Sequence, residues 1–172
     1  MQPSYVHVYT GDGKGKTTAA FGLALRMIGA GHRAFVGQFV KGMEYSELRA
    51  APLLGDRLQI EQFGRDCFIR REPDDEDRRL ARAGLDRVAA VLRSGEFRLV
   101  VLDEANIAVH FGLFTVAQLL EVLRRRAPEV EAVVTGRRAH PDLLEYADLV
   151  TEMREVKHYY TQGVSARRGI ES

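Results

Sequence analysis

The sequence predicts an α/β fold in which a mostly parallel sheet is flanked by helices. Apolar runs of strand length alternate along the chain with amphipathic segments of helix length, which is typical of chains built from strand–helix–strand units. A glycine-rich turn joins the first apolar run directly to the first helix pattern. The 172 residues fit one domain and are enough to bury a full core, so we expect a single domain over residues 1–172.

The first strand, the glycine-rich turn and the first helix form the most informative stretch. The alternating run from Tyr5 to Tyr9 predicts a strand, and the segment from Thr17 to Met27 predicts a helix. A loop between them lets consecutive backbone N–H groups surround a phosphate, and the helix dipole favours the same anion. This context disfavours the alternative of a simple surface turn. The residues expected to bind phosphate are Gly11, Asp12, Gly13, Lys14, Gly15, Lys16, Thr17 and Thr18.

This loop is one residue shorter than the common G-x-x-x-x-G-K-[ST] pattern. The pattern requires glycine at position 10, where the chain has Thr10, so the loop is counted from Gly11. We expect Lys16 to bind the outer phosphates and the Thr17 hydroxyl to ligate Mg²⁺. The predicted fold is therefore P-loop NTPase-like (RecA-like), with a shortened phosphate loop.

The middle of the chain predicts two strands and two helices. The strands are expected at Arg33–Val40 and Leu58–Phe63, and the helices at Glu44–Leu54 and from Asp74 to about Ser94. Lys41 follows the second strand at its carboxyl end, where open α/β sheets bind their ligands. Four acidic residues begin the longer helix, and complementation of the helix dipole is favoured there over a metal site.

An unbroken apolar run from Phe97 ends in the carboxylates Asp103 and Glu104. Such a run suits a central strand that is buried on both faces. Its carboxyl end lies at the edge of the sheet from which the phosphate loop also emerges. We therefore expect a carboxylate here to hold Mg²⁺, directly or through water, opposite Thr17.

The remaining elements continue the alternation. We expect a helix at Thr115–Arg126, a strand at Glu131–Thr135, a helix at His140–Tyr146 and a strand at Ala147–Met153. Arg137 follows the first of these strands and is placed to bind a phosphate or to seal the site. Residues 154–172 are polar but contain aromatic side chains, so we expect this tail to pack near the active site. The five histidines show no metal-ligand spacing and are expected to be structural.

Composition excludes several classes of protein. The formal net charge of +1 provides no bulk field for nucleic acid or a membrane surface. A single cysteine, Cys67, excludes an intramolecular disulfide and a cysteine-based zinc site. The sequence shows neither an apolar run of about 18 residues nor the pattern of a signal peptide. We expect a soluble, cytoplasmic protein without nucleic-acid or membrane partners.

Motifs along nearly the whole chain resemble the ATP:corrinoid adenosyltransferases of the CobA/CobO type. They occur in the same order as in that family and are, in sequence, Thr10–Gly22, Gln38–Gly42, Val101–Glu104, Thr135–Arg137, Ala147–Met153, and Lys157-His158 with Gly163–Glu171. The combination is far more specific than any one of these motifs alone.

The resemblance implies transfer of the 5′-deoxyadenosyl group of ATP to the Co(I) of a corrinoid, with release of triphosphate. It implies Mg²⁺ as a cofactor, with Thr17 and Glu104 as its ligands. Lys16, Thr17 and Glu104 are the implied catalytic residues. The loop from Gly11 to Thr18 is the implied triphosphate site, with Arg137 as a further contact. Lys41, at its strand end, is also expected to bind the cofactor. ATP is implied to bind in reverse, with its γ-phosphate deep in the loop and C5′ facing the corrin.

The family also makes Co(II) easier to reduce by displacing the lower cobalt ligand with apolar side chains. The corresponding loop here is Gly64–Ile69, and Phe68 is the implied residue, alone or with Phe63 or Ile69. Family members often have a tryptophan in this loop, whereas this chain has none. The family further implies a homodimer and a reductase or flavodoxin-type electron donor.

Two other functions are compatible with a phosphate loop. A kinase or ATPase would act on the γ-phosphate, with Asp103 as a base and Arg137 and Arg138 as lid residues. A non-catalytic ATP-dependent binding module would use the tail to switch between states. The phosphate products of a reaction with reduced cobalamin separate these functions.

Overall fold

The computed structural model describes residues 3–65 and 72–171. The strands of this part of the chain form one six-stranded sheet in the order β3-β2-β4-β5-β1-β6. All neighbouring strands are parallel, so their carboxyl ends lie at one edge of the sheet. The strands are β1 (Val6–Thr10), β2 (Ala34–Phe39), β3 (Leu58–Phe63), β4 (Leu99–Asp103), β5 (Glu131–Thr135) and β6 (Leu149–Glu152).

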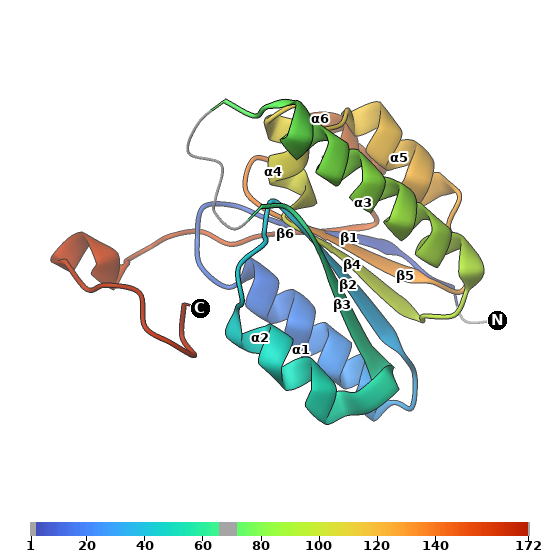
Figure 1. The fold of residues 1–172 in the computed structure, drawn as a ribbon, viewed down its shortest axis with the longest axis horizontal. Helices are drawn as coiled ribbons and strands as arrows, with labels where there is room; N and C mark the ends of the chain where they lie inside the picture. Colours follow the sequence, from blue (N-terminus) through green and yellow to red (C-terminus); the bar gives the residue numbers. More distant parts are fainter. Residues whose placement is uncertain (1–2, 66–71, 172) are drawn as a thin grey trace.

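Helices cover both faces of the sheet, so the fold has three layers (Figure 1). One face carries α1 (Lys16–Gly29) and α2 (Ser46–Ala50), which continues into a 3₁₀ segment (Ala51–Arg57). The other face carries α3 (Asp75–Ser94), α4 (Ala105–His110), α5 (Val116–Arg124) and α6 (Pro141–Tyr146). None of the described helices is both long and apolar enough to cross a bilayer.

The two faces of the sheet bury separate apolar cores. The larger core lies under α3, α4 and α5 and includes Phe35, Phe39 and Phe114, and the smaller one lies under α1 and includes Ala20 and Ala24. Every residue of β2 and of β4 is buried, as expected for central strands that are covered on both sides. The predicted α/β architecture is thus confirmed.

Two helical segments differ from the sequence predictions. The helix expected at Glu44–Leu54 is only five residues of α-helix, because Pro52 lies in the following 3₁₀ segment and Gly55 takes a non-helical φ of 61°. The second difference is α4, which the sequence pattern did not predict. It begins directly after β4, without the glycine, proline or side-chain cap that usually marks a helix start.

The acidic start of α3 is a helix cap. Asp74 accepts a hydrogen bond from the Asp77 N–H at 3.0 Å, and the Asp77 carboxylate accepts one from the Asp74 N–H at 3.1 Å. This reciprocal pair is a capping box. Arg65 also donates to Asp77 at 2.8 Å, which ties the end of the β3 loop to the helix.

Substituting Gly84 is expected to destabilise the contact between α3 and β3. A Cβ at Gly84 would lie 2.3 Å from Cγ of Phe63, so Gly84→Ala forces the helix or the ring to move. We expect a loss of about 1–3 kcal/mol in the free energy of unfolding, measured by urea denaturation. Gly22→Ala in α1 is the matched control, because a Cβ there meets nothing within 4 Å. It is expected to gain up to about 1 kcal/mol, and equal stabilities for the two variants would contradict the packing account.

Candidate active site

The phosphate loop begins at Gly11 because position 10 still belongs to a strand. Thr10 is the last residue of β1, and its hydroxyl accepts a hydrogen bond from the Ala139 N–H at 3.3 Å. Gly11 then takes a φ of 94°, a conformation that favours glycine. The turn that the common pattern places at position 10 therefore occurs one residue later, which accounts for the shortened loop.

The loop packs tightly against the segment that follows β6. The Gly13 N–H donates to the Met153 carbonyl at 2.6 Å, and the Met153 N–H donates to the Thr10 carbonyl at 2.8 Å. A Cβ at Gly11 or Gly13 would lie only 2.4 or 2.6 Å from that Met153 oxygen. Glycine is therefore required at both positions, and the start of the C-terminal tail is fixed to the loop.

Lys16 is the buried cation of the loop. Its ammonium donates to the carbonyls of Gly11 and Gly13, both at 2.7 Å, and the residue is only 7% exposed. Burial lowers the pKa of Lys16, and the positive charge of Arg137 acts in the same direction, while Glu104 opposes both. Lys16 is the first residue of α1, and its ammonium holds together two carbonyls of the loop that precedes the helix.

Asp103, at the end of β4, is the centre of a buried polar cluster. Its Oδ1 accepts from the hydroxyls of Thr17 at 2.8 Å and Thr135 at 2.7 Å. Its Oδ2 accepts from the Lys41 ammonium at 2.7 Å and the Gln38 amide at 3.2 Å. Two donors on each oxygen fill the accepting capacity of a carboxylate. Because Asp103 is fully buried and saturated, it is not placed to act as a base on a substrate.

Lys41 belongs to this cluster and also lines the pocket. Burial by itself lowers the pKa of Lys41, but the charge and hydrogen bond of Asp103 outweigh burial, so the pKa is raised. Its ammonium lies 5.2 Å from the centre of the Tyr45 ring. Lys41 is therefore held charged beside Asp103.

Glu104 differs from Asp103 in its backbone conformation and in the contacts of its carboxylate. It takes left-handed backbone angles, φ 60° and ψ 18°, at the turn from β4 into α4. No described residue hydrogen-bonds or pairs with its carboxylate, which lines the pocket. Burial raises the pKa of Glu104, and the neighbouring Asp103 adds to that shift, against the opposing charges of Lys41 and Lys16.

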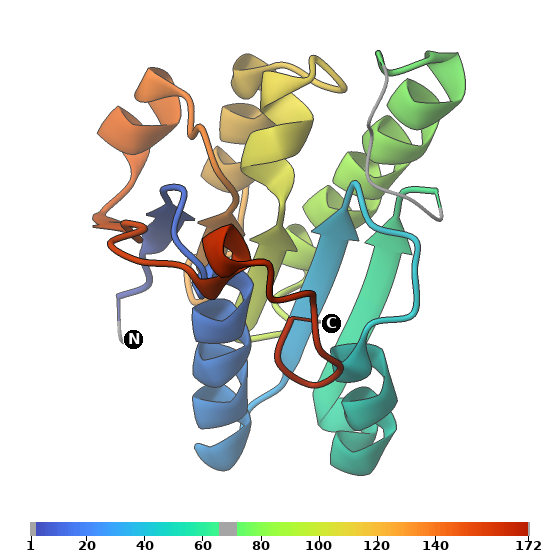
Figure 2. The ribbon, with the colours of Figure 1, turned by 90° about the vertical axis from the view of Figure 1, so that its left-hand side faces the viewer.

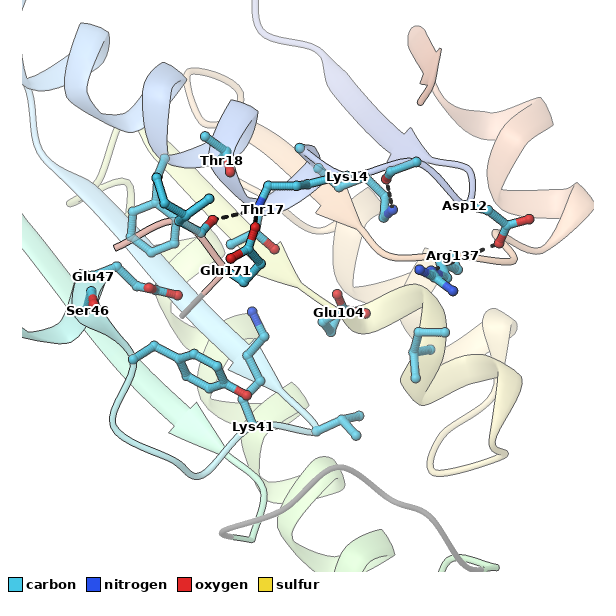
Figure 3. Close-up of a pocket in the computed structure, with 18 of the residues that line it drawn as sticks. Asp12, Lys14, Thr17, Thr18, Lys41, Ser46, Glu47, Glu104, Arg137 and Glu171 are labelled. Carbon is cyan, nitrogen blue, oxygen red and sulfur yellow. Dashed lines mark hydrogen bonds and ion pairs between the residues drawn. The ribbon is translucent and has the colours of Figure 1, made fainter. Parts of the chain in front are cut away.

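A pocket of about 870 Å³ brings these elements together. Lys41 and Glu104 lie across it from Thr17 and Thr18 (Figure 3). Apolar side chains line it at two places: Val40, Ile107 and Phe111 near Glu104, and Phe21, Tyr45 and Ala50 between α1 and α2. Arg137 also lines the pocket, 4.0 Å from Asp12, with more than half of its side chain exposed. The pocket therefore joins the glycine-rich loop to a strand-end carboxylate and apolar walls.

The C-terminal tail supplies another wall of this pocket. It crosses in front of α1 and ends near α2 (Figure 2), and its lining residues include Ile170 and Glu171. The Lys14 ammonium donates to the Ile170 carbonyl at 2.5 Å and lies 3.4 Å from Glu171. Glu171 also accepts a hydrogen bond from the Arg167 N–H at 2.8 Å. The chain that follows β6 thus contacts the phosphate loop twice, at Met153 just before the tail and at Ile170 near the end of the tail.

The chain matches one protein family over nearly its whole length. The family model described as ATP:corrinoid adenosyltransferase BtuR/CobO/CobP matches residues 2–172. The chain belongs to this family. Corrinoid adenosyltransferases from Sinorhizobium sp. and Pseudomonas aeruginosa are 36% and 35% identical to it, over 95% of this chain and 78% and 81% of theirs. The corrinoid adenosyltransferase of Escherichia coli K12 is 33% identical over 95% of this chain and 83% of its own length.

The pocket of this adenosyltransferase collects most of the residues that were predicted as site residues. The predicted residues that line it are Asp12, Gly13, Lys14, Gly15, Lys16, Thr17, Thr18, Lys41, Glu104 and Arg137. Gly11 does not line the pocket, but its carbonyl holds the Lys16 ammonium. Phe68 and most of its loop lie outside the described residues.

Three features of the site were not foreseen. Thr135 bonds to both Asp103 and Glu104, Asp103 is a saturated structural group, and Glu171 reaches the phosphate loop. The Asp-Glu pair after an apolar strand was the available signal for the first two features. Nothing local could indicate a contact between residues 14 and 171.

Two oxygen-bearing side chains of the pocket are suited to hold a magnesium ion. The Thr17 hydroxyl donates a hydrogen bond to Asp103, so the lone pairs of the Thr17 oxygen stay available. The Glu104 carboxylate is unpartnered among the described residues. Mg²⁺ is usually held by one or two such protein oxygens together with substrate phosphates. The described residues contain no cluster of three or more His, Cys, Asp or Glu side chains arranged around a metal site.

Proposed function

We propose that this pocket transfers the 5′-deoxyadenosyl group of MgATP to the Co(I) of a corrinoid and releases triphosphate. The observation that carries the proposal is the junction, in one pocket, of the phosphate loop, Glu104 and an apolar wall, in a chain of the corrinoid adenosyltransferase family. Cobalt supplies the electron pair for the new Co–C5′ bond, and the C5′–O bond breaks with its electrons going to the triphosphate. The protein must therefore position two substrates and stabilise a highly charged leaving group.

Lys16 and the amides at the start of α1 stabilise that leaving group. The first backbone N–H groups of a helix have no intrahelical acceptors, and they point at an anion held in the loop. Lys16 adds a full charge in a buried position, where electrostatic interactions are less screened than in water. Mg²⁺, held by Thr17 and Glu104, would neutralise further phosphate charge.

The apolar wall near Glu104 is the proposed contact for the corrinoid. Val40, Ile107 and Phe111 provide the only apolar lining on the α4 side among the described residues. We propose that ATP lies with its triphosphate in the loop and C5′ towards this wall, so that cobalt can approach the carbon. A crystal structure with MgATP tests this direction, since the ordinary orientation would place the γ-phosphate there instead.

A spectroscopic assay tests the function. Purified protein is mixed with MgATP and chemically reduced cobalamin, and the visible spectrum and phosphate products are followed. We expect a light-sensitive alkylcobalamin and one equivalent of inorganic triphosphate. ADP or orthophosphate without alkylcobalamin would support the kinase or ATPase instead, and binding of ATP without any turnover would support a binding module.

The tail is part of the proposed nucleotide site. We expect Glu171→Gln to loosen it, because Glu171 joins Lys14 to the Arg167 backbone. Trypsin cleavage after Arg167 should then become faster, and ATP should protect the wild-type protein. Glu129→Gln, at a distance from the tail, is the control. Equal cleavage rates in all three proteins would contradict a tail that packs on the loop.

The proposal extends to the assembly and to the source of electrons. A homodimer is proposed from the family, and sedimentation of the purified chain tests it. A reductase or flavodoxin-type protein is proposed to make Co(I), and turnover from Co(II) with such a donor tests that. Phe68 is proposed to lie below the cobalt, so Phe68→Ala should slow turnover from Co(II) more than turnover from pre-formed Co(I).

A further inference from the structure

The conformation of Glu104 needs support from its surroundings. A residue with a side chain rarely adopts φ 60° and ψ 18°, and it persists there only where neighbouring groups determine it. At this turn the chain changes from β4 to α4, and the carboxylate enters the pocket. The groups that hold the turn therefore also aim the carboxylate.

The Thr135 hydroxyl is one of these groups. Thr135 is fully buried at the end of β5, and its Oγ1 accepts a hydrogen bond from the Glu104 N–H at 3.0 Å. The same hydroxyl donates to Asp103 Oδ1 at 2.7 Å. Because the hydroxyl directs its hydrogen to Asp103, a lone pair of its oxygen accepts from the backbone N–H of Glu104. One side chain therefore connects the Asp103 carboxylate to the backbone N–H of Glu104.

The next residue of the chain supports the same turn from its other side. The Gly136 carbonyl accepts from the Asn106 amide at 2.8 Å, which fixes the first turn of α4. A Cβ at Gly136 would lie 3.2 Å from Glu104 Oε2 and 3.0 Å from Asn106 Cβ, and its φ of 126° also favours glycine. The end of β5 thus both holds the Glu104 backbone and leaves space for its carboxylate.

We propose that Thr135 is a positioning residue for the metal–nucleotide complex and acts through Glu104. Its hydroxyl fixes the left-handed turn so that the Glu104 carboxylate faces Thr17 across the pocket. This inference rests on the proposed function, because it concerns how the same site binds MgATP. A purely structural role, in which Thr135 serves only to satisfy Asp103, is the alternative to be separated.

Three variants separate these roles. Thr135→Val keeps the shape of the side chain but removes both hydrogen bonds, and Thr135→Ser keeps the hydroxyl. Gln38→Leu is the matched control, since Gln38 is equally buried and donates to Asp103 Oδ2 but does not contact Glu104. ATP binding is measured by calorimetry with Mg²⁺ and with EDTA, and the melting temperature is measured for each variant.

We expect Mg²⁺ to strengthen ATP binding in the wild type, Thr135→Ser and Gln38→Leu. In Thr135→Val the affinity in EDTA should stay within about threefold of the wild type, while the strengthening by Mg²⁺ falls about tenfold, the loss typical of removing a group that orients a metal ligand. Thr135→Val and Gln38→Leu should lower the melting temperature to a similar extent. In a Glu104→Ala background, adding Thr135→Val should change MgATP affinity by less than about twofold, as for residues that act as one unit.

The possible outcomes distinguish the inference from the function on which it rests. If Thr135→Val keeps the full effect of Mg²⁺, or loses ATP affinity equally with and without the metal, Thr135 does not position Glu104. The same conclusion follows if the two substitutions add independently. If the wild type binds ATP without any effect of Mg²⁺, the proposed metal site and the role of Thr135 both fail.

Discussion

Replacing Lys16 with alanine is expected to reduce adenosyl transfer by about a hundredfold to a thousandfold, the cost typical of removing one preorganised donor from a developing negative charge. Lys16 is buried, and its ammonium is bonded to the Gly11 and Gly13 carbonyls. Its loss therefore removes both the charge that is proposed to stabilise the leaving triphosphate and the bonds to the loop carbonyls. The rate is measured from pre-formed Co(I) at saturating MgATP, so that reduction of cobalt does not limit it.

Lys14 provides the matched control for this variant. It is the other lysine of the loop, but its ammonium is turned to the tail, where it meets the Ile170 carbonyl. We expect Lys14→Ala to cost less than about tenfold, because long charged side chains at exposed positions contribute little. A larger loss in Lys14→Ala than in Lys16→Ala would indicate that Lys14, and not Lys16, binds the triphosphate.

The Glu104→Ala substitution is expected to have an effect of similar size through a different route. It removes the one carboxylate of the pocket that is free to hold Mg²⁺ on the β4 side of the described site. Turnover should fall by about a hundredfold or more, and the Mg²⁺ concentration for half-maximal rate should rise, because Mg²⁺ is usually held by only one or two protein carboxylates. The measurement is a Mg²⁺ titration of the initial rate.

The conservative variant and a second carboxylate sharpen this prediction. Glu104→Gln keeps the length of the side chain but loses its charge, and it should resemble Glu104→Ala. Glu155→Gln removes a carboxylate of the tail that also lines the pocket, and it should cost less than about tenfold, since Glu155 is an exposed residue that is not among the predicted metal ligands. Unchanged metal dependence in Glu104→Gln would contradict the assignment of Glu104.

Much of the fold could be predicted because its signals are local. The strands Leu58–Phe63 and Glu131–Thr135 occur at the predicted bounds, since turn residues lie near both ends of each segment. The helix α3 begins directly after its acidic cap and ends at Ser94, followed by Gly95, which takes the left-handed conformation common after helices. In contrast, α4 has no cap signal, and its six residues are too few to show a helical periodicity.

From the sequence, the site could be predicted only as separate groups of residues at the ends of individual strands. Sequence placed Asp103 and Glu104 together and could not show that the left-handed turn between them divides their roles. The contact of Lys14 with Glu171 joins residues 157 positions apart, and no periodicity reports such pairs. The geometry of parallel strands brought the loop and the carboxylates to one edge, which is why the general location of the pocket was predictable.

The hydrogen bond between Gly13 and Met153 limits how this protein can be re-engineered. A loop of ordinary length, transplanted from another nucleotide-binding protein, would have to fit an extra residue into a loop that already packs tightly against the Met153 backbone. The graft would succeed only if the last strand and the chain leaving it were exchanged as well. The loop and the segment after β6, which lie far apart in the sequence, therefore form one structural unit.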